Sequence, residues 1–170
     1  SITPDYCRKA KKVIVEVNNQ VPRCLGGLDE GIHISKITMV VEGPNTPLLQ
    51  LPATPASDAD RMIAQHVMNL LEDGSTIQLG IGGLPNIVGE MIAQSDLKDL
   101  GVHTEMLADS YVDMYQAGRI TGKYKAIDRH KMVYTFAMGT QKLYDFLDNN
   151  PAAAIFPASY TNDPCVIGRN

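Results

Sequence analysis

One stretch of the chain, residues 76–105, combines two short apolar runs with a helical pattern between them. The first run, residues 76–79, is followed by a turn, after which Pro85 opens the helical pattern, a position where proline is well tolerated. The second run, residues 102–105, ends on Glu105. The turn is rich in glycine and contains Gly80, Gly82 and Gly83. This order predicts a strand, a tight turn, a helix and a second strand.

The geometry of such a unit predicts where a ligand would bind. Two parallel strands joined through a helix form a right-handed crossover, which leaves the carboxyl ends of both strands at one edge of the sheet. We therefore expect the glycine turn and Glu105 to face a common crevice, the usual ligand position in open α/β sheets. The backbone N–H groups that begin the helix would favour an anion or an oxyanion there.

The chain around this unit continues the alternation of strands and helices. Ser57 and Asp60 have the spacing of a capping box at the start of a helix, and Gly74 is a suitable stop for it. Asp109 is predicted to cap a further helix that ends before Gly118. Further strands are predicted at residues 131–136 and 152–155, and a helix at residues 140–147. The predicted fold class is therefore α/β, with a mainly parallel open sheet and flanking helices.

The first part of the chain is separated from this region by a proline-rich segment. Residues 13–17 predict a buried strand and residues 33–42 a second strand, with a loop between them. Because proline removes backbone donors and disfavours helix before it, the following segment reads as a linker. Its prolines are Pro44, Pro47, Pro52 and Pro55. We expect a boundary here, with residues 1–43, 44–57 and 58–170 as first domain, linker and second domain.

Composition narrows the classes of function. The chain is 44% hydrophobic and 20% charged, which is typical of a globular protein, and its net charge of −4 argues against a nucleic acid partner. No apolar run approaches the roughly 18 residues of a membrane span, so no membrane association is expected. Cys7, Cys24 and Cys165 are expected to be reduced, buried side chains in a cytoplasmic protein. None has metal-ligand spacing, and no metal site is predicted.

Two functions would explain a glycine turn followed by a carboxylate. The first is dinucleotide binding, because Gly80 and Gly82 begin a G-x-G-x-x-G pattern and Glu105 lies roughly where a ribose-binding acid belongs. Pro85 occupies the position of the third glycine, and this counts against it. The second is acyl transfer, with the glutamate as nucleophile and the turn as a source of backbone donors. A third interpretation is that the glycines form a tight turn and nothing more.

Several strings in the chain resemble those of a known enzyme family. IQLGIGGLP, HTEMLADSYVDM and YTNDP are similar to segments of the acetyl-CoA hydrolase/transferase family of class I coenzyme A transferases, in particular the 4-hydroxybutyrate and butyrate CoA-transferases. AKKVIVEVNNQVP and AGRITGKYK also resemble that family, so the likeness covers nearly the whole chain. The glycine string and HTEM at the correct spacing are specific as a pair.

The resemblance implies two tandem α/β domains in the full protein, of which this chain is a fragment. It implies that the family's catalytic glutamate is Glu105. It also implies that the coenzyme A-binding residues are those of the turn: Gly80, Ile81, Gly82, Gly83 and Leu84. The body of the first domain and a later glycine-rich loop are absent from this chain. Activity is therefore expected of the full-length protein.

The implied reaction moves coenzyme A from a short-chain acyl-CoA, such as acetyl-CoA, to a small carboxylate, such as 4-hydroxybutyrate or butyrate. Glu105 would form a mixed anhydride and then a glutamyl-CoA thioester. Coenzyme A is thus a substrate, and no permanently bound cofactor is expected. The alternatives are an acyl-CoA hydrolase on the same scaffold and a nucleotide-binding module without covalent chemistry. The acyl group, the acceptor and the possibility of a homo-oligomer stay open.

The remaining polar side chains and three methionines are expected to be structural. His103 reads as a buried, hydrogen-bonded histidine, with orientation of Glu105 as the alternative. A basic group is expected to be a solvated face, with contacts to coenzyme A phosphates as the alternative; it contains Lys123, Lys125, Arg129 and Lys131. Asn162 and Asp163 are expected to cap a turn. The remaining histidines are expected to be structural or on the surface, and three methionines to fill the core. These residues are His33, His66, His130, Met62, Met68 and Met91.

Overall fold

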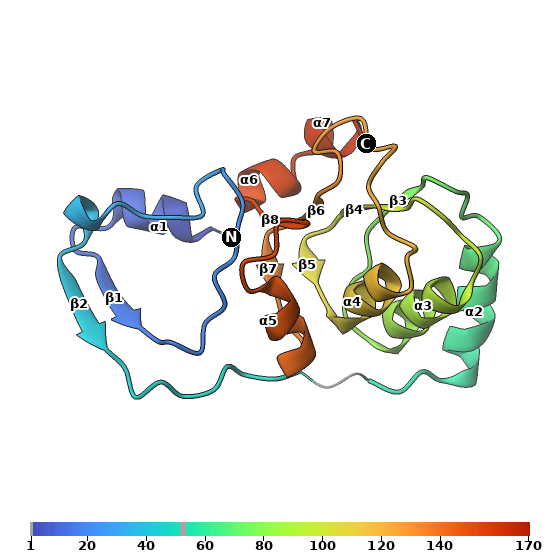
Figure 1. Ribbon diagram of the computed structural model, residues 1–170, viewed down its shortest axis with the longest axis horizontal. Coiled ribbons are helices and arrows are strands. Elements are labelled where there is room, and N and C mark those ends of the chain that lie inside the picture. Colours follow the sequence, from blue (N-terminus) through green and yellow to red (C-terminus); the bar gives the residue numbers. More distant parts are fainter. Residues whose placement is uncertain (1, 52–53) are drawn as a thin grey trace.

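The computed structural model describes residues 2–51 and 54–170, which form two lobes joined by an extended strap (Figure 1). In the first lobe, β1 and β2 pair in parallel, with Val15 opposite Val40. The described residues between 43 and 57 form no helix or strand, as expected of a linker. Pro52 of the predicted linker lies outside the described residues. The elements of the first lobe are α1 (Thr3–Lys9), β1 (Ile14–Val17), the 3-10 helix η1 (Ile34–Lys36) and β2 (Met39–Glu42).

The second lobe is built on a four-stranded parallel sheet whose strand order, β3-β4-β6-β8, follows the chain. Its helices are α2 (Asp58–Met68), α3 (Gly83–Gln94), α4 (Asp109–Gln116), α5 (Gln141–Leu147), α6 (Ala158–Thr161) and α7 (Pro164–Ile167). Its strands are β3 (Thr76–Ile77), β4 (Gly101–His103), β5 (Met106–Leu107), β6 (Met132–Tyr134), β7 (Phe136–Ala137) and β8 (Ala153–Ile155). The α/β fold class with a parallel sheet and flanking helices is thereby confirmed.

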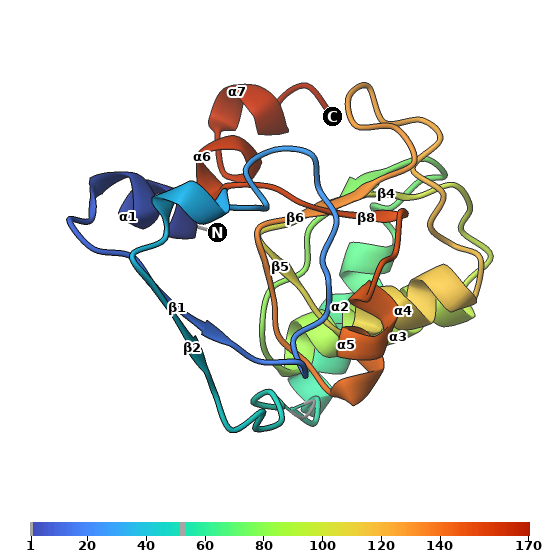
Figure 2. The same ribbon diagram turned by 60° about the vertical axis from the view of Figure 1, so that its left-hand side comes forward.

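Four helices cover one face of this sheet. Because successive strands are neighbours and right-handed crossovers all turn the same way, the connecting helices lie on the same side. In Figure 2, α2 to α5 lie together below the strands, and α6 and α7 lie above them. The core forms where the helices meet the strands and includes Val102, Met132, Ile92, Tyr111 and Leu143.

The strands β5 and β7 continue β4 and β6 after a break at Glu105. His103 is opposite Val133 before the break, and Met106 is opposite Phe136 after it, so the register is unchanged. At the break, the carbonyl oxygen of Glu105 accepts hydrogen bonds from the backbone N–H groups of Thr135, at 3.0 Å, and Phe136, at 3.1 Å. The predicted strand at residues 102–105 is therefore interrupted, and Glu105 lies at a kink.

The helix predicted after the glycine turn is present, although it begins two residues before Pro85, its expected first residue. Its expected apolar face is the face that packs: Ile87, Val88 and Ile92 are buried, and Leu84 and Met91 are half-buried. The helix begins at Gly83, so Pro85 is its third residue, where the N–H group that proline lacks has no intrahelical partner in any case. The capping box of Ser57 and Asp60 is likewise present at the start of α2.

Other local predictions were wrong. Residues 33–42 do not form one strand, because η1 occupies its first half. The strand at residues 13–17 forms but is not buried, since Ile14 is 61% exposed. The helix that was expected to stop at Gly74 ends earlier, at Met68, and Met62 does not fill the core but is 64% exposed. The two burial errors share one cause: an apolar pattern shows that a residue can be buried, and the neighbouring elements decide whether it is.

Cys165 was also expected to be buried but is exposed, whereas Cys7 and Cys24 are half-buried, and all three are free. His33, His66 and His130 are exposed, which agrees with the expectation of structural or surface residues. Asp163 accepts a hydrogen bond from the backbone N–H of Cys165 at 2.7 Å and caps α7, as expected for a turn-capping residue.

Candidate functional site

The glycine turn has a backbone conformation that glycine alone adopts readily. Gly82, the residue that precedes α3, has φ of 123° and ψ of −179°, a region that is essentially restricted to glycine. Gly83 is needed for a different reason. A Cβ atom there would lie 2.9 Å from the carbonyl oxygen of Pro55 and 3.1 Å from Oδ2 of Asp60. The turn therefore packs directly on the strap and on the first turn of α2.

The start of α3 has no side-chain cap, because Gly82 has no side chain to supply one. The backbone N–H groups of Gly83 and Leu84 belong to the first turn of the helix and have no acceptor within it. Such groups carry the positive end of the helix dipole. The turn can therefore offer hydrogen-bond donors to an oxygen that carries or develops negative charge.

A groove of about 510 Å³ lies beside the turn. Gly80, Ile81 and Gly82 line it, together with Met106, the residue after Glu105. Among the described residues, the lining does not include Glu105, Gly83 or Leu84. The structure thus brings the turn and the neighbour of Glu105 to one groove. A common crevice for the turn and the Glu105 carboxylate stays a prediction.

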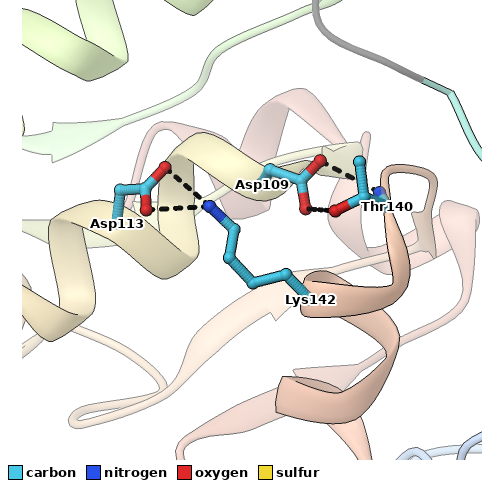
Figure 3. A network of polar contacts seen from close by, with 4 residues as sticks. All are labelled: Asp109, Asp113, Thr140 and Lys142. Carbon is cyan, nitrogen blue, oxygen red and sulfur yellow. Dashed lines mark hydrogen bonds and ion pairs between the residues drawn. The ribbon is translucent and has the colours of Figure 1, made fainter.

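The charges along this groove are mainly negative. Glu90, Asp109 and Asp113 line it, against a single lysine among the described lining residues, Lys142. Lys142 is already paired with Asp113, at 2.8 Å from Nζ to Oδ1 (Figure 3). An acidic groove disfavours phosphate groups and suits an uncharged ligand segment such as an amide or thioester.

Asp109 has a different role from the one predicted. It was expected to cap its own helix, but it is the first residue of α4, which has no side-chain cap at Ala108. Its carboxylate instead accepts hydrogen bonds from the backbone N–H and the hydroxyl of Thr140, each at 2.9 Å (Figure 3). Asp109 therefore caps the start of α5 and joins two helices at the groove. Sequence reasoning missed this contact because Thr140 is far from Asp109 in the chain.

Glu105 is exposed, in contrast to its neighbours Thr104 and Met106, which are buried. Its backbone is fixed by the two hydrogen bonds to its carbonyl oxygen, so the kink holds an exposed residue in place. This arrangement presents a carboxylate on a rigid support. It is compatible with nucleophilic attack, which needs a positioned and accessible group.

His103 is buried and hydrogen-bonded, as expected. Its Nε2 lies 2.8 Å from the carbonyl oxygen of Thr161, and its Nδ1 lies 3.2 Å from Nδ2 of Asn170. A carbonyl accepts but cannot donate, so Nε2 carries the proton and Nδ1 accepts from Asn170. Burial lowers the pKa of His103, which favours the neutral ring.

The predicted basic face is wrong at Lys125. Its side chain is 1% exposed, and Nζ donates to the carbonyl oxygens of Val102, at 2.9 Å, and Lys131, at 3.0 Å. Burial lowers the pKa of Lys125 to about 8. A stem that crosses Gly101 explains the burial, since a Cβ atom on Gly101 would lie 2.6 Å from Cγ of Lys125. Lys123 is exposed, as a solvated face requires.

In residues 2–51 and 54–170, no three His, Cys, Asp or Glu side chains are grouped so as to hold a metal ion. Over the same residues, no helix has the length and apolar character needed to cross a membrane.

Comparison with known proteins places the chain in a family. The family model described as the acetyl-CoA hydrolase/transferase N-terminal domain matches residues 1–52, and that of the C-terminal domain matches residues 139–170. Butyryl-CoA:acetate CoA-transferase of Anaerostipes caccae is 54% identical over 156 residues, which cover 91% of this chain and 35% of that protein. The chain belongs to the acetyl-CoA hydrolase/transferase family.

Two further proteins match nearly the whole chain. The 4-hydroxybutyrate coenzyme A transferase of Clostridium kluyveri is 41% identical over 173 residues, which cover 99% of this chain and 39% of that protein. The crystal structure of RipA from Yersinia pestis matches with a TM-score of 0.91 at 38% identity, over 99% of this chain and 38% of that one. The chain therefore spans well under half the length of the family members it matches.

Proposed function

We propose that the full-length protein is a CoA-transferase that moves coenzyme A between a short-chain acyl-CoA and a small carboxylate. The observation that carries the proposal is the accessible carboxylate of Glu105 on a fixed backbone, one residue from a groove that the glycine turn lines. The relative named as a butyryl-CoA:acetate CoA-transferase supports an exchange between butyryl-CoA and acetate, whose reverse uses acetyl-CoA and butyrate, and the other supports 4-hydroxybutyrate as a carboxylate.

The proposed reaction proceeds through Glu105 in four balanced steps. The Glu105 carboxylate attacks the thioester carbonyl; a C–O bond forms, the C–S bond breaks, and CoA leaves as the thiolate. The thiolate then attacks the glutamyl carbonyl of the mixed anhydride, which releases the first carboxylate and leaves a glutamyl-CoA thioester. The acceptor carboxylate repeats these two steps in reverse. One anion enters and one leaves in each step, so no net proton transfer is required.

The glycine turn is proposed to hold the reacting end of coenzyme A. The N–H groups of Gly83 and Leu84, in the first turn of α3, which has no side-chain cap, are suited to an oxyanion that forms at the attacked carbonyl. The acidic lining, with Glu90, Asp109 and Asp113, supports placing the uncharged pantetheine and thioester there and the phosphates elsewhere. Binding of the remote nucleotide can then stabilise the strained acyl centre.

The exposure of Glu105 favours a second candidate, an acyl-CoA hydrolase on the same scaffold. Water that reaches either acyl intermediate would hydrolyse it, so a transferase must exclude water at this point. In the full-length protein, release of acetate from acetyl-CoA without a carboxylate acceptor would favour the hydrolase. Transfer that greatly exceeds this release would favour the CoA-transferase.

The deciding experiment uses the full-length protein with acetyl-CoA and butyrate. We expect butyryl-CoA to form, and hydride reduction during turnover followed by peptide mass analysis to find Glu105 modified. Glu105→Gln should lose at least about three orders of magnitude in kcat, because an amide cannot form the anhydride. Glu72→Gln, a change at another exposed glutamate, is the matched control. An active enzyme with an unmodified Glu105 would contradict the proposal.

A further inference from the structure

A single buried tyrosine connects the two parts of the proposed site. Tyr111 lies in α4 and its side chain is fully buried. The backbone N–H of Leu79, the residue before Gly80, donates to the Tyr111 hydroxyl at 2.6 Å. The Thr104 side chain, from the residue before Glu105, also acts on this hydroxyl, through a side-chain hydrogen bond that lowers the pKa of Tyr111. One phenol thus contacts the residue that precedes each part of the site.

Hydrogen bonds link the residues around this hydroxyl in series. Thr104 is fully buried, and its hydroxyl donates to the carbonyl oxygen of Met106 at 2.9 Å. Tyr111 accepts from Leu79, and its side-chain hydrogen bond with Thr104 lowers the pKa of Tyr111. This series of hydrogen bonds extends from the segment before the glycine turn to the backbone on both sides of Glu105.

Burial makes this connection difficult to replace. Water cannot take the place of the Tyr111 hydroxyl in the core, so its loss would leave the Leu79 N–H without an acceptor. Burial also raises the pKa of Tyr111 to about 12, so the hydroxyl stays protonated and uncharged at physiological pH. Tyr111 does not line the groove, so it would act on a ligand through Leu79 and Thr104.

We propose that Tyr111 is a positioning residue, which sets the distance between the glycine turn and Glu105 for the covalent step. The inference rests on the proposed transfer through Glu105. Rates of such reactions are sensitive to displacement of the reacting groups by about 1 Å. The proposal therefore concerns the rate of chemistry in the bound complex more than the strength of binding.

The test is Tyr111→Phe in the full-length protein, which removes one oxygen atom and keeps the ring in the core. Per folded molecule, we expect kcat and the single-turnover rate of Glu105 modification to fall roughly tenfold to hundredfold, with little change in KM for acetyl-CoA. A purely structural tyrosine would lower the melting temperature and leave the kcat of the folded fraction unchanged.

Tyr134→Phe is the matched control. Tyr134 is also buried, in β6, but its hydroxyl makes no hydrogen bond with any described residue. We expect its kcat to equal that of the wild type. Equal kcat for Tyr111→Phe and Tyr134→Phe would overturn the inference.

Thr104→Val removes the next hydroxyl in this series of hydrogen bonds and provides an independent variant. If the two hydroxyls act as one unit, the double variant with Tyr111→Phe should lose less kcat than the product of the single losses. Full multiplication of the two effects would contradict a shared role. If Tyr111→Phe does not fold, the kcat of Thr104→Val alone decides, with the same loss expected. Absence of transfer by the wild type would overturn the proposed function, and this inference with it.

Discussion

The Nε2 atom of His103 lies 2.8 Å from the carbonyl oxygen of Thr161, and this contact fastens β4 to α6 two residues before Glu105. It is made with a neutral ring, because burial lowers the pKa of His103. The charged groups that act on this ring are Lys125, which lowers its pKa, and Asp128, which raises it. The strand that leads to Glu105 is therefore held by a titratable group.

The first prediction concerns acid stability. A free histidine has a pKa of about 6.5, so below this pH the unfolded state binds a proton that His103 in the folded state resists. The free energy of unfolding should fall as pH decreases from about 6.5 toward 5. Urea unfolding of the full-length protein over this range should show a smaller decrease for His103→Gln. His66→Gln, at an exposed histidine, should retain the wild-type slope, and equal slopes for all three proteins would contradict the prediction.

The second prediction concerns alkaline stability and Lys125. Its pKa is lowered to about 8 in the folded state, whereas a free lysine has a pKa of about 10.4. Between these values the unfolded state holds a proton that the folded state has released. Stability should therefore rise with pH in this window, by at most about 1.4 kcal/mol per pH unit. Asp128 is the charged neighbour that opposes the shift.

Lys125→Met should lack this rise, and the difference in slope between wild type and variant is the measured quantity. Titration of buried tyrosines affects both proteins equally and cancels in the comparison. Lys123→Met, at an exposed lysine, is the control. A Lys125→Met protein that gains stability between pH 8 and 10 as the wild type does would refute a buried, weakly basic lysine.

The third prediction separates the two carboxylates in Figure 3. Asp109→Asn places an amide NH₂ group where one of the two Thr140 donors needs an acceptor. We expect a loss of about 1–3 kcal/mol in the free energy of unfolding. Lys142→Ala breaks the exposed pair with Asp113 and should cost about 0–1 kcal/mol. Thermal and urea unfolding would distinguish them, and a larger loss in Lys142→Ala would reverse our assignment.

The fourth prediction compares two glycines of the turn. Gly82→Ala forces a residue with a Cβ atom to adopt φ of 123°, which costs about 1–3 kcal/mol or displaces the turn. Gly80→Ala adds a methyl group where no other atom lies within 4 Å, so it should leave stability nearly unchanged. Activity assays of the full-length protein should show a greater loss for Gly82→Ala. Equal stability of the two variants would argue against strain at Gly82.

The parts of the fold that depend on nearby residues were predictable from the sequence. The capping box of Ser57 and Asp60 and the apolar face of α3 involve residues within a few positions of one another, and both are present. The alternation of strands and helices then limited the topology to a parallel sheet. For the same reason, the glycine turn is where the sequence pattern places it.

The contacts that were missed join residues far apart in the chain. Asp109 has the sequence context of an N-cap, yet it caps α5 instead. Lysine is a residue type that is usually exposed to solvent. The ammonium group of Lys125 is nevertheless buried, where it donates to two backbone carbonyl oxygens. Tyr111 reads as one more apolar residue of a helix. In each case the partner is fixed by tertiary packing, which no local pattern encodes.

The outer edge of β8 shows how the two lobes depend on each other. The N–H of Ile155 donates to the carbonyl oxygen of Leu25 at 2.9 Å, and the N–H of Asn149 donates to that of Arg23 at the same distance. A segment of the first lobe therefore occupies the side of β8 that faces away from β6. During synthesis the ribosome completes this covering segment long before β8 emerges. An unpaired strand edge can bind a neighbouring nascent chain. Here a segment of the same polypeptide, synthesised earlier, is available to pair with the edge of β8.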